Sequence, residues 1–219
     1  MVYEIGKSVK KRPKIACCIP LSWEFVSKYF FLSWYLMHTY SRGRYDMMLL
    51  FGNSCFMDEM RDNLGKTALE HNPDYILWID ADQFYHQRTP EVLMKHIDSG
   101  KSVVGGLTPN KLDQTPLVYD ITDIEGKIEQ KKDIKPGQGI IKVDAMGFGG
   151  VMMTPKVLED MKFPWFKMQW SPKLKERPGE DTKFYVNCRK FHVDVWCDTD
   201  LVFDHIVTQP IGIKEAKSI

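Results

Sequence analysis

The fold of this 219-residue chain is indicated most clearly by the stretch Tyr75-Ile76-Leu77-Trp78-Ile79-Asp80-Ala81-Asp82. Its five apolar residues are typical of a strand that is buried on both faces of a parallel sheet. Side chains two positions apart on a strand point the same way, so Asp80 and Asp82 can converge on one cation. Open α/β sheets bind ligands at the carboxyl ends of their strands. Carboxylate oxygens in that place suit Mg²⁺ or Mn²⁺ bound to a phosphate.

Apolar runs and helical periodicity alternate on both sides of this stretch. Strands are predicted at 15–19, 47–51, 75–79, 102–106, 140–145, 193–197 and 201–205, and residues 151–153 are a further apolar run. Helices are predicted at 22–40, with Ser22 as the cap, and then at 57–71, 90–99, 155–161 and from within 178–182 onward. This alternation predicts an α/β fold with a mostly parallel central sheet flanked by helices. Residues 111–139 break the alternation and indicate a small hairpin, which we interpret as an insertion or lid.

Composition excludes some classes of partner. The chain has 30 basic and 29 acidic residues and a formal net charge of +1, so no nucleic-acid partner is predicted. The basic residues near the start, within an arm at 1–13, are interpreted as solvated. The aromatic segment 21–40 contains Glu24, Lys28 and His38, which interrupt it too often for a membrane span. It is predicted to form a helix packed on the sheet, with at most peripheral membrane contact.

The five cysteines indicate the cellular compartment in which the protein is expected. They are odd in number, have apolar neighbours and lack the spacing of a metal site, which predicts reduced and mostly buried thiols. Cys17 and Cys18 are adjacent on a predicted strand and are expected to face opposite ways. The N-terminal residues are polar and basic, without the apolar core of a secretory signal. A cytoplasmic location is therefore expected.

Four features follow one another along the chain, and together they support a family resemblance. They are Asp80-Ala81-Asp82, Gly147-Phe148-Gly149-Gly150, Glu180-Asp181 and His205. In this order and spacing the chain resembles the GT-A glycosyltransferases, above all the family 2-like enzymes, over nearly its whole length. The resemblance implies a single GT-A domain over 1–219 with a Rossmann-like N-terminal half. Residues 14–110 would form the nucleotide-sugar-binding half and residues 140–219 the acceptor-binding half.

The resemblance implies a donor site that contains a divalent metal. Asp80 and Asp82 match the family's metal-binding motif, and His205 matches the histidine that completes the metal shell in many relatives. A Mn²⁺ or Mg²⁺ ion there would offset the charge of a leaving nucleoside diphosphate. Pro20, Arg61 and Ala81 match further positions beside the nucleotide-sugar. Asn53 stands where relatives often carry an Asp that contacts the base, and this departure leaves the base open. A UDP-sugar is the first expectation for the donor, with GDP- and TDP-sugars as alternatives. Without the resemblance, Arg61 could be an exposed helix arginine and His205 an ordinary hydrogen-bonded histidine.

The resemblance also implies an acceptor site and a catalytic base. Asp181 matches the general base that takes the proton of the acceptor hydroxyl, with Glu180 as the alternative, which implies inversion by single displacement. Either acid could instead cap the helix that follows it. Gly149 and Gly150 would let a sugar approach the backbone, although a plain tight turn is the alternative. Trp165 is the expected stacking platform for a glycan or other hydroxyl acceptor, although Trp165, Phe166 and Trp170 could equally be core residues.

Three other functions compete with a glycosyltransferase. Haloacid dehalogenase phosphatases also place Asp-x-Asp after an apolar strand, but at the first strand of the chain and with Thr or Val where Phe84 stands here. A nucleotidyltransferase would need a glycine-rich loop after its first strand, and Pro20-Leu21-Ser22-Trp23 is not one. A nucleotide-sugar-binding or glycan-binding module without turnover is the non-enzymatic alternative.

Overall fold

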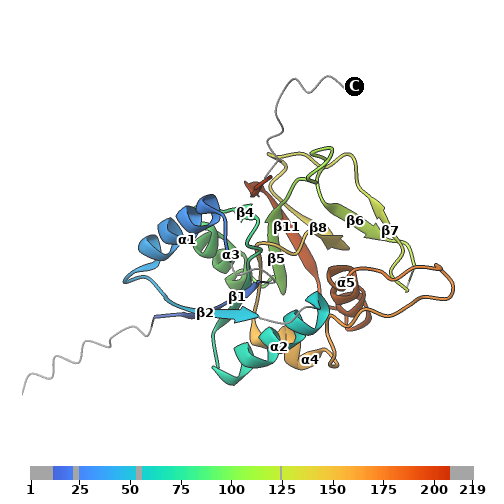
Figure 1. Cartoon of the computed structure of the whole chain (residues 1–219), viewed down its shortest axis with the longest axis horizontal. Helices are drawn as coiled ribbons and strands as arrows, with labels where there is room; N and C mark the ends of the chain where they lie inside the picture. The colour runs from blue at the N-terminus through green and yellow to red at the C-terminus, as the bar shows by residue number, and fades with distance from the viewer. Residues whose placement is uncertain (1–11, 22–24, 53–55, 124, 208–219) are drawn as a thin grey trace, which may run out of the picture.

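The computed structural model describes residues 12–21, 25–52, 56–123 and 125–207. Seven strands form a central sheet in the order β2-β1-β3-β10-β5-β11-β8 (Figure 1). Their bounds are Lys14–Pro20 for β1, Asp46–Gly52 for β2, Tyr75–Trp78 for β3, Val103–Leu107 for β5, Ile140–Val143 for β8, Val151–Met153 for β10 and Val195–Val202 for β11. Only β8 and β10 run against the common direction of these strands. The predicted α/β class with a mostly parallel central sheet is thereby confirmed.

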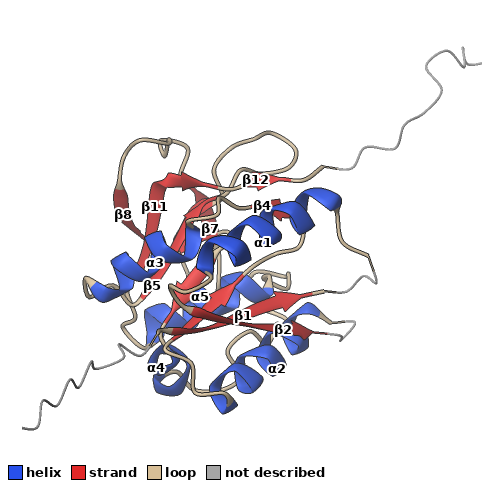
Figure 2. Cartoon of the chain, turned by 90° about the vertical axis from the view of Figure 1, so that its left-hand side faces the viewer, coloured by secondary structure: helices blue, strands red, loops and turns tan. Residues whose placement is uncertain are grey.

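Helices cover both faces of this sheet (Figures 1 and 2). On one face lie α1 (Lys28–Ser41) and α3 (Thr89–Asp98). On the other lie α2 (Met57–Glu70), α4 (Pro155–Asp160) and α5 (Glu180–Lys190). The pleat of β1 divides the core accordingly, since Cys17 packs in the cluster with α1 and α3, and Cys18 in the cluster with α2, α4 and α5. The prediction that these two cysteines face opposite ways is confirmed.

The start of the first helix differs from the prediction. Helix α1 begins at Lys28, and the hydroxyl oxygen of Ser27 accepts a hydrogen bond from the backbone N–H of Tyr29 at 3.2 Å. Ser27 is therefore the N-cap, with the extended backbone that this position requires. Residues 25–27 are not helical, so the predicted start at Ser22 is wrong, although Ser22 itself lies outside the described residues.

Two smaller sheets complete the fold. Strands β6 (Val118–Ile121) and β7 (Ile128–Gln130) pair as the predicted hairpin, and β9 (Ala145–Met146) extends them to three strands. Most of segment 111–139 is thus tied to the body of the protein through β9. Strand β4 (Gln83–Phe84), which the sequence did not predict, pairs with β12 (Asp204–His205). This pair brings the chain just after Asp82 beside His205.

The thiols match their prediction where the structure describes them. Cys17, Cys18, Cys188 and Cys197 are free and buried, whereas Cys55 lies outside the described residues. Burial raises the pKa of the Cys17 thiol well above its ordinary value, so it stays protonated and unreactive. Within the described residues, no helix combines the length and the apolar character needed to cross a bilayer.

Candidate functional site

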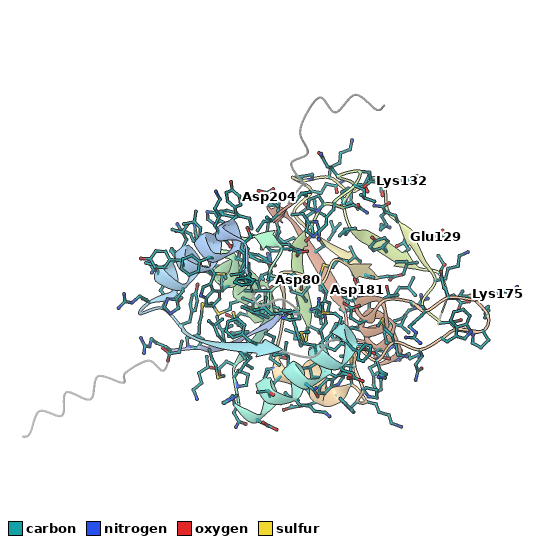
Figure 3. The ribbon with its side chains drawn as sticks, viewed as in Figure 1. Asp80, Glu129, Lys132, Lys175, Asp181 and Asp204 are labelled. Atoms are coloured by element: carbon teal, nitrogen blue, oxygen red, sulfur yellow. The ribbon has the colours of Figure 1, made fainter. Side chains whose placement is uncertain are left out.

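A cavity of about 550 Å³ opens at the carboxyl ends of β1 and β3. It collects side chains from three parts of the fold, because the ends of parallel strands and the start of α5 meet there. Six residues predicted for the site line it, namely Pro20, Arg61, Asp80, Ala81, Asp82 and Glu180. Figure 3 shows Asp80 and Asp181 toward the middle of the molecule, with Glu129, Lys132 and Lys175 near its edge. Asn53 lies outside the described residues.

The turn that contains Asp80 and Asp82 is held by a buried tyrosine. The hydroxyl oxygen of Tyr85 accepts from the backbone N–H of Asp80 at 2.8 Å, and it lies within donating distance of both the Asp80 carbonyl and Gln83 Oε1. The backbone N–H of Tyr85 donates to Ser33 Oγ in α1 at 3.1 Å. These bonds fix the backbone of the turn, and the carboxylates of Asp80 and Asp82 line the cavity. No sequence motif pointed to Tyr85 or Gln83.

Arg61 is the cation of the cavity. It lies in α2 and is only 3% exposed, which excludes the reading as an exposed helix arginine. Its Nη2 lies 2.9 Å from Asp80 Oδ1, and its Nε lies 3.4 Å from Glu180 Oε1. The guanidinium carbon lies 4.8 Å from the centroid of the Phe148 ring, a cation–π arrangement. Within the described structure, Nε and Nη1 are buried and have no hydrogen-bond partner.

The charge of Arg61 is maintained by its surroundings. Burial alone would lower its pKa, but the carboxylates of Asp80, Glu180 and Asp181 outweigh burial and raise that pKa above its ordinary value. The guanidinium is therefore a permanent positive charge in a site shielded from water. Its unpaired N–H groups can donate to an anion that enters the cavity, for which phosphate oxygens are well suited.

The acid pair stands at the start of α5. Glu180 lines the cavity, and burial raises its pKa against the opposing effect of Arg61. Burial also raises the pKa of Asp181. The backbone N–H of Thr182, which donates to Asp181 Oδ1 at 2.6 Å, acts in the opposite direction and lowers that pKa. That bond satisfies a first-turn N–H of the helix, as a capping acid would. The other oxygen, Oδ2, has no hydrogen-bond partner among the described residues.

The three predicted metal ligands do not converge in this structure. Asp80 pairs with Arg61, and Asp82 forms an ion pair with Lys111. In the part of the chain that the structure describes, no three His, Cys, Asp or Glu side chains are grouped so as to hold a metal ion. Asp80 and Asp82 nevertheless line the same cavity, and carboxylate oxygens suit Mg²⁺ or Mn²⁺.

His205 lies beside the aspartate turn without joining it. Strand pairing sets His205 opposite Gln83, and the backbone N–H of Ile206 donates to the Asp82 carbonyl at 2.7 Å. The Nδ1 atom of His205 lies 2.5 Å from the carbonyl oxygen of Pro109, which can only accept, so Nδ1 carries the proton. The lone pair is then on Nε2, which lies 3.3 Å from the amide nitrogen of Gln83. This tautomer is the one that metal-binding histidines adopt.

The acceptor residues expected from the sequence require correction. Trp165 is 4% exposed, and its indole N–H donates to the Leu158 carbonyl at 2.9 Å, so it is a core residue and not a stacking platform. Gly149 and Gly150 are also buried. A Cβ atom would meet the Gln83 amide at Gly149 and the Phe203 ring at Gly150. The close approach that these glycines allow is therefore made by the protein's own side chains.

A second cavity, of about 430 Å³, lies beside α5. It is lined by Trp170, which is 60% exposed, and by Pro178, Lys183 and Lys190 around α5. Glu180, two residues after Pro178, lines the first cavity. Asp181 is not among the residues that line either cavity. Of the three aromatic residues weighed from the sequence, Trp170 is the exposed one.

Comparisons with known proteins identify a fold and no function. No protein-family model and no curated protein matches the chain. The crystal structure of A197 from STIV is similar to this chain, with a TM-score of 0.63 and 17% sequence identity. The match covers 90% of this chain and 86% of that chain. At this identity the similarity is evidence for a shared α/β fold alone.

Proposed function

We propose that this protein is a glycosyltransferase that moves a sugar from a nucleotide-sugar, with UDP-sugars as the first candidates, to an acceptor hydroxyl. The observation that carries the proposal is the single cavity in which Arg61, Asp80, Asp82 and Glu180 meet. Two carboxylates after the carboxyl end of a parallel strand, with a cation from α2 beside them, suit a metal-bound pyrophosphate. When bound, a Mn²⁺ or Mg²⁺ ion held by Asp80 and Asp82 would offset the charge of the leaving diphosphate.

The residues of the chain supply the remaining chemistry. Nη1 of Arg61 has no partner among the described residues and would donate to a phosphate oxygen at the wall of the cavity. The free oxygen of Asp181 would take the proton of the acceptor hydroxyl while that oxygen attacks the anomeric carbon. The bond between the anomeric carbon and the phosphate oxygen breaks in the same step, and the configuration at the anomeric carbon is inverted. We favour Asp181 over Glu180 as the base because Glu180 is held by Arg61.

The arrangement favours transfer over phosphatase chemistry. A phosphatase of the haloacid dehalogenase type would use Asp80 as its nucleophile, which must approach phosphorus freely. Here Asp80 Oδ1 is engaged by a buried guanidinium at 2.9 Å. A binding module without turnover would not need two partly buried acids at the start of α5, where burial raises the pKa of both.

The test measures nucleotide release from a panel of nucleotide-sugars, with and without Mn²⁺. Donor binding is followed separately by the shift in melting temperature. We expect Asp82→Asn to lose metal-dependent donor binding, and Asp181→Asn to keep donor binding but lose at least about 100-fold in turnover. Asp160→Asn, in the exposed i,i+4 pair with Lys156 on α4, is the matched control and should behave like the parent protein.

Each alternative predicts a different result in the same assay. Release of inorganic phosphate from simple monoesters, without nucleotide release, would point to a phosphatase. Donor binding without turnover in the parent protein would point to a binding module. Normal turnover of Asp181→Asn would contradict the assignment of the base.

A further inference from the structure

The outward side of α1 is apolar, where a helix at the surface of a protein normally carries polar side chains. Its buried stripe is narrow and consists of Phe30, Ser33, Met37 and Ser41. The exposed side chains next to this stripe form what we call the α1 patch, made up of Phe25, Tyr29, Phe31, Leu32, Tyr35 and Leu36. Their exposed fractions run from 38% for Leu36 to 86% for Phe25.

The α1 patch is not covered by another element of the described structure. Figure 1 places α1 at the edge of the molecule, and Figure 2 shows it on the side that faces the viewer. From the sequence, this segment is predicted to pack on the sheet, and only the stripe of Phe30, Ser33, Met37 and Ser41 is buried. A contiguous exposed patch of large apolar side chains usually marks a binding surface for a protein or a membrane.

The charged side chains of α1 and of the turn that follows it are basic. Helix α1 contains no Asp or Glu. Lys28 is its first residue, and Arg42 and Arg44 follow its last, all three exposed. Among the described residues, Glu91 is the acid that accepts a hydrogen bond from this helix, through Tyr40, and it is already paired with Arg88 and Lys95. The sequence before β1 is also basic. The occupant of the patch should therefore be apolar with a negatively charged rim.

We propose that the α1 patch docks the protein on the surface of an anionic phospholipid membrane, with α1 lying in the plane of the interface. Phe31, Leu32 and Leu36 enter the acyl boundary, and the tyrosine rings lie at headgroup depth, where an apolar ring with a polar tip is stable. The basic residues at both ends of the helix contact lipid phosphates. In a symmetric pairing of two copies through this patch, like charges would meet at both ends of the helix, which disfavours a second copy as the occupant.

The position of the patch relates it to the candidate site. Phe25 lines the 550 Å³ cavity as well as belonging to the patch. Ser33, on the buried side of α1, accepts from the backbone N–H of Tyr85 and so supports the aspartate turn. Docking through α1 would set the mouth of the cavity beside the membrane surface. Membrane binding itself does not depend on the proposed transferase activity.

The test is flotation of the full chain with phosphatidylcholine vesicles that do or do not contain phosphatidylserine, without donor or metal. We expect the parent protein to float with the phosphatidylserine vesicles at low salt and to be released as salt is raised. Phe31→Ser combined with Leu32→Ser should lower the partition coefficient about tenfold or more, because two exposed apolar side chains no longer enter the lipid. Phe191→Ser, which changes a 41% exposed phenylalanine after α5, is the matched control and should leave flotation unchanged.

Every other result argues against the proposal. Failure of the parent protein to float, or equal flotation of the parent and the α1 double variant, would overturn it. Equal binding to both kinds of vesicle would overturn the role of the basic residues. A parent protein that is dimeric by light scattering, made monomeric by the double variant and indifferent to vesicles, would instead identify a second copy as the occupant. Circular dichroism of each variant ensures that a loss of flotation is not a loss of folding.

Discussion

Arg61 combines two roles that are usually separate, since it is a buried cation in the core and also lines the candidate site. It lies against the Phe148 ring and neutralises part of the charge of Asp80 and Glu180. A buried ion pair adds little net stability, but removal of one partner leaves an uncompensated charge away from water. The cost of losing Arg61 should therefore be large and should depend on pH.

We predict that Arg61→Met destabilises the fold by about 3 kcal/mol near neutral pH. Burial raises the folded-state pKa of both Glu180 and Asp181, so the folded state keeps its protons to a higher pH than the unfolded chain. The stability that these two groups contribute is thus greatest below their unfolded pKa and falls as pH rises through the folded pKa. Loss of the guanidinium raises both pKa values further, so the deficit of the variant should shrink on acidification.

Urea unfolding at several pH values from mildly acidic to mildly basic measures this dependence. Arg88→Met is the control, because Arg88 pairs with Glu91 at the solvent-exposed surface and should contribute little to stability. If the free energy of unfolding of Arg61→Met is lower than that of the parent protein by the same amount at every pH, then packing, and not charge, accounts for the loss of stability.

Sequence reasoning could find Arg61, Asp80, Asp82 and Glu180 because they belong to local patterns beside recognisable strands and helices. It could not find Tyr85 or Gln83. Their roles come from hydrogen bonds to a turn whose shape no periodicity encodes. Trp165 was misassigned for a related reason, since a tryptophan after a proline in a loop has the same local sequence whether it is exposed or buried.

At the scale of elements, β4 and the turn before it depend on the hydroxyl of Tyr85. We predict that Tyr85→Phe costs about 1–3 kcal/mol, because the buried N–H of Asp80 loses its acceptor while the ring stays packed against Phe203. The change should also weaken metal-dependent donor binding, since the aspartate turn is no longer fixed. Urea unfolding and donor titration measure the two effects. Tyr119→Phe, in β6, is a tyrosine control that should not affect donor binding.

The contact between Lys111 and Asp82 links the segment 111–139 to the site. The ammonium group of Lys111 forms an ion pair with the Asp82 carboxylate. A metal ion would bind the same carboxylate, so the metal ion and the lysine should compete for it. We predict that Lys111→Met raises the apparent affinity for Mn²⁺ by about two- to fivefold, a small effect because both side chains are about half exposed. Calorimetric titration of Mn²⁺ measures it, with Lys131→Met as the control, since Lys131 pairs with Asp120 in the same segment. A lower affinity in Lys111→Met would mean that the lysine organises the site.

The aromatic loop between α4 and α5 gives a test of the second cavity. Asp62 fixes this loop by accepting from the backbone N–H groups of Trp165 and Phe166, which leaves Trp170 exposed at the cavity. If the second cavity holds the acceptor, Trp170→Ala should raise the KM for acceptor about tenfold and leave donor binding unchanged. Phe163→Ala, on the same loop but outside that cavity, should change neither. An effect of Trp170→Ala on the donor alone would place the acceptor elsewhere.

At the scale of the whole molecule, the hydrophobic pattern predicts which segments are strands but not how they are ordered. Short apolar runs such as 15–19 and 47–51 are correctly predicted as strands, and the apolar run 151–153 forms β10. Their pattern cannot show that β10 enters the sheet antiparallel between β3 and β5. That position depends on long-range pairing and on the glycine turn that precedes β10. The candidate site depends on it in turn, because β10 pairs with the strand that leads to Asp80.

The glycine turn therefore tests the assembly of the sheet. The backbone N–H of Gly150 donates to the Trp78 carbonyl, and its own carbonyl accepts from the N–H of Gly106, so this one residue joins β3 to β5. Gly150 has φ +79, and an added Cβ would come within 2.1 Å of the Phe203 ring. Strain and overpacking together predict that Gly150→Ala costs about 2–5 kcal/mol. Gly147→Ala is the matched control in the same turn, since its Cβ would meet only ordinary contacts at 3.4 Å or more.

Urea unfolding of both glycine variants, followed by tryptophan fluorescence, makes the comparison. The buried Trp78 lies on β3 beside this turn, so its emission reports on the region where the two parts of the sheet meet. We expect Gly147→Ala to unfold within about 1 kcal/mol of the parent protein. Equal stability of the two variants would mean that Gly150 does not require its left-handed backbone, and the placement of β10 between β3 and β5 would then have to be revised.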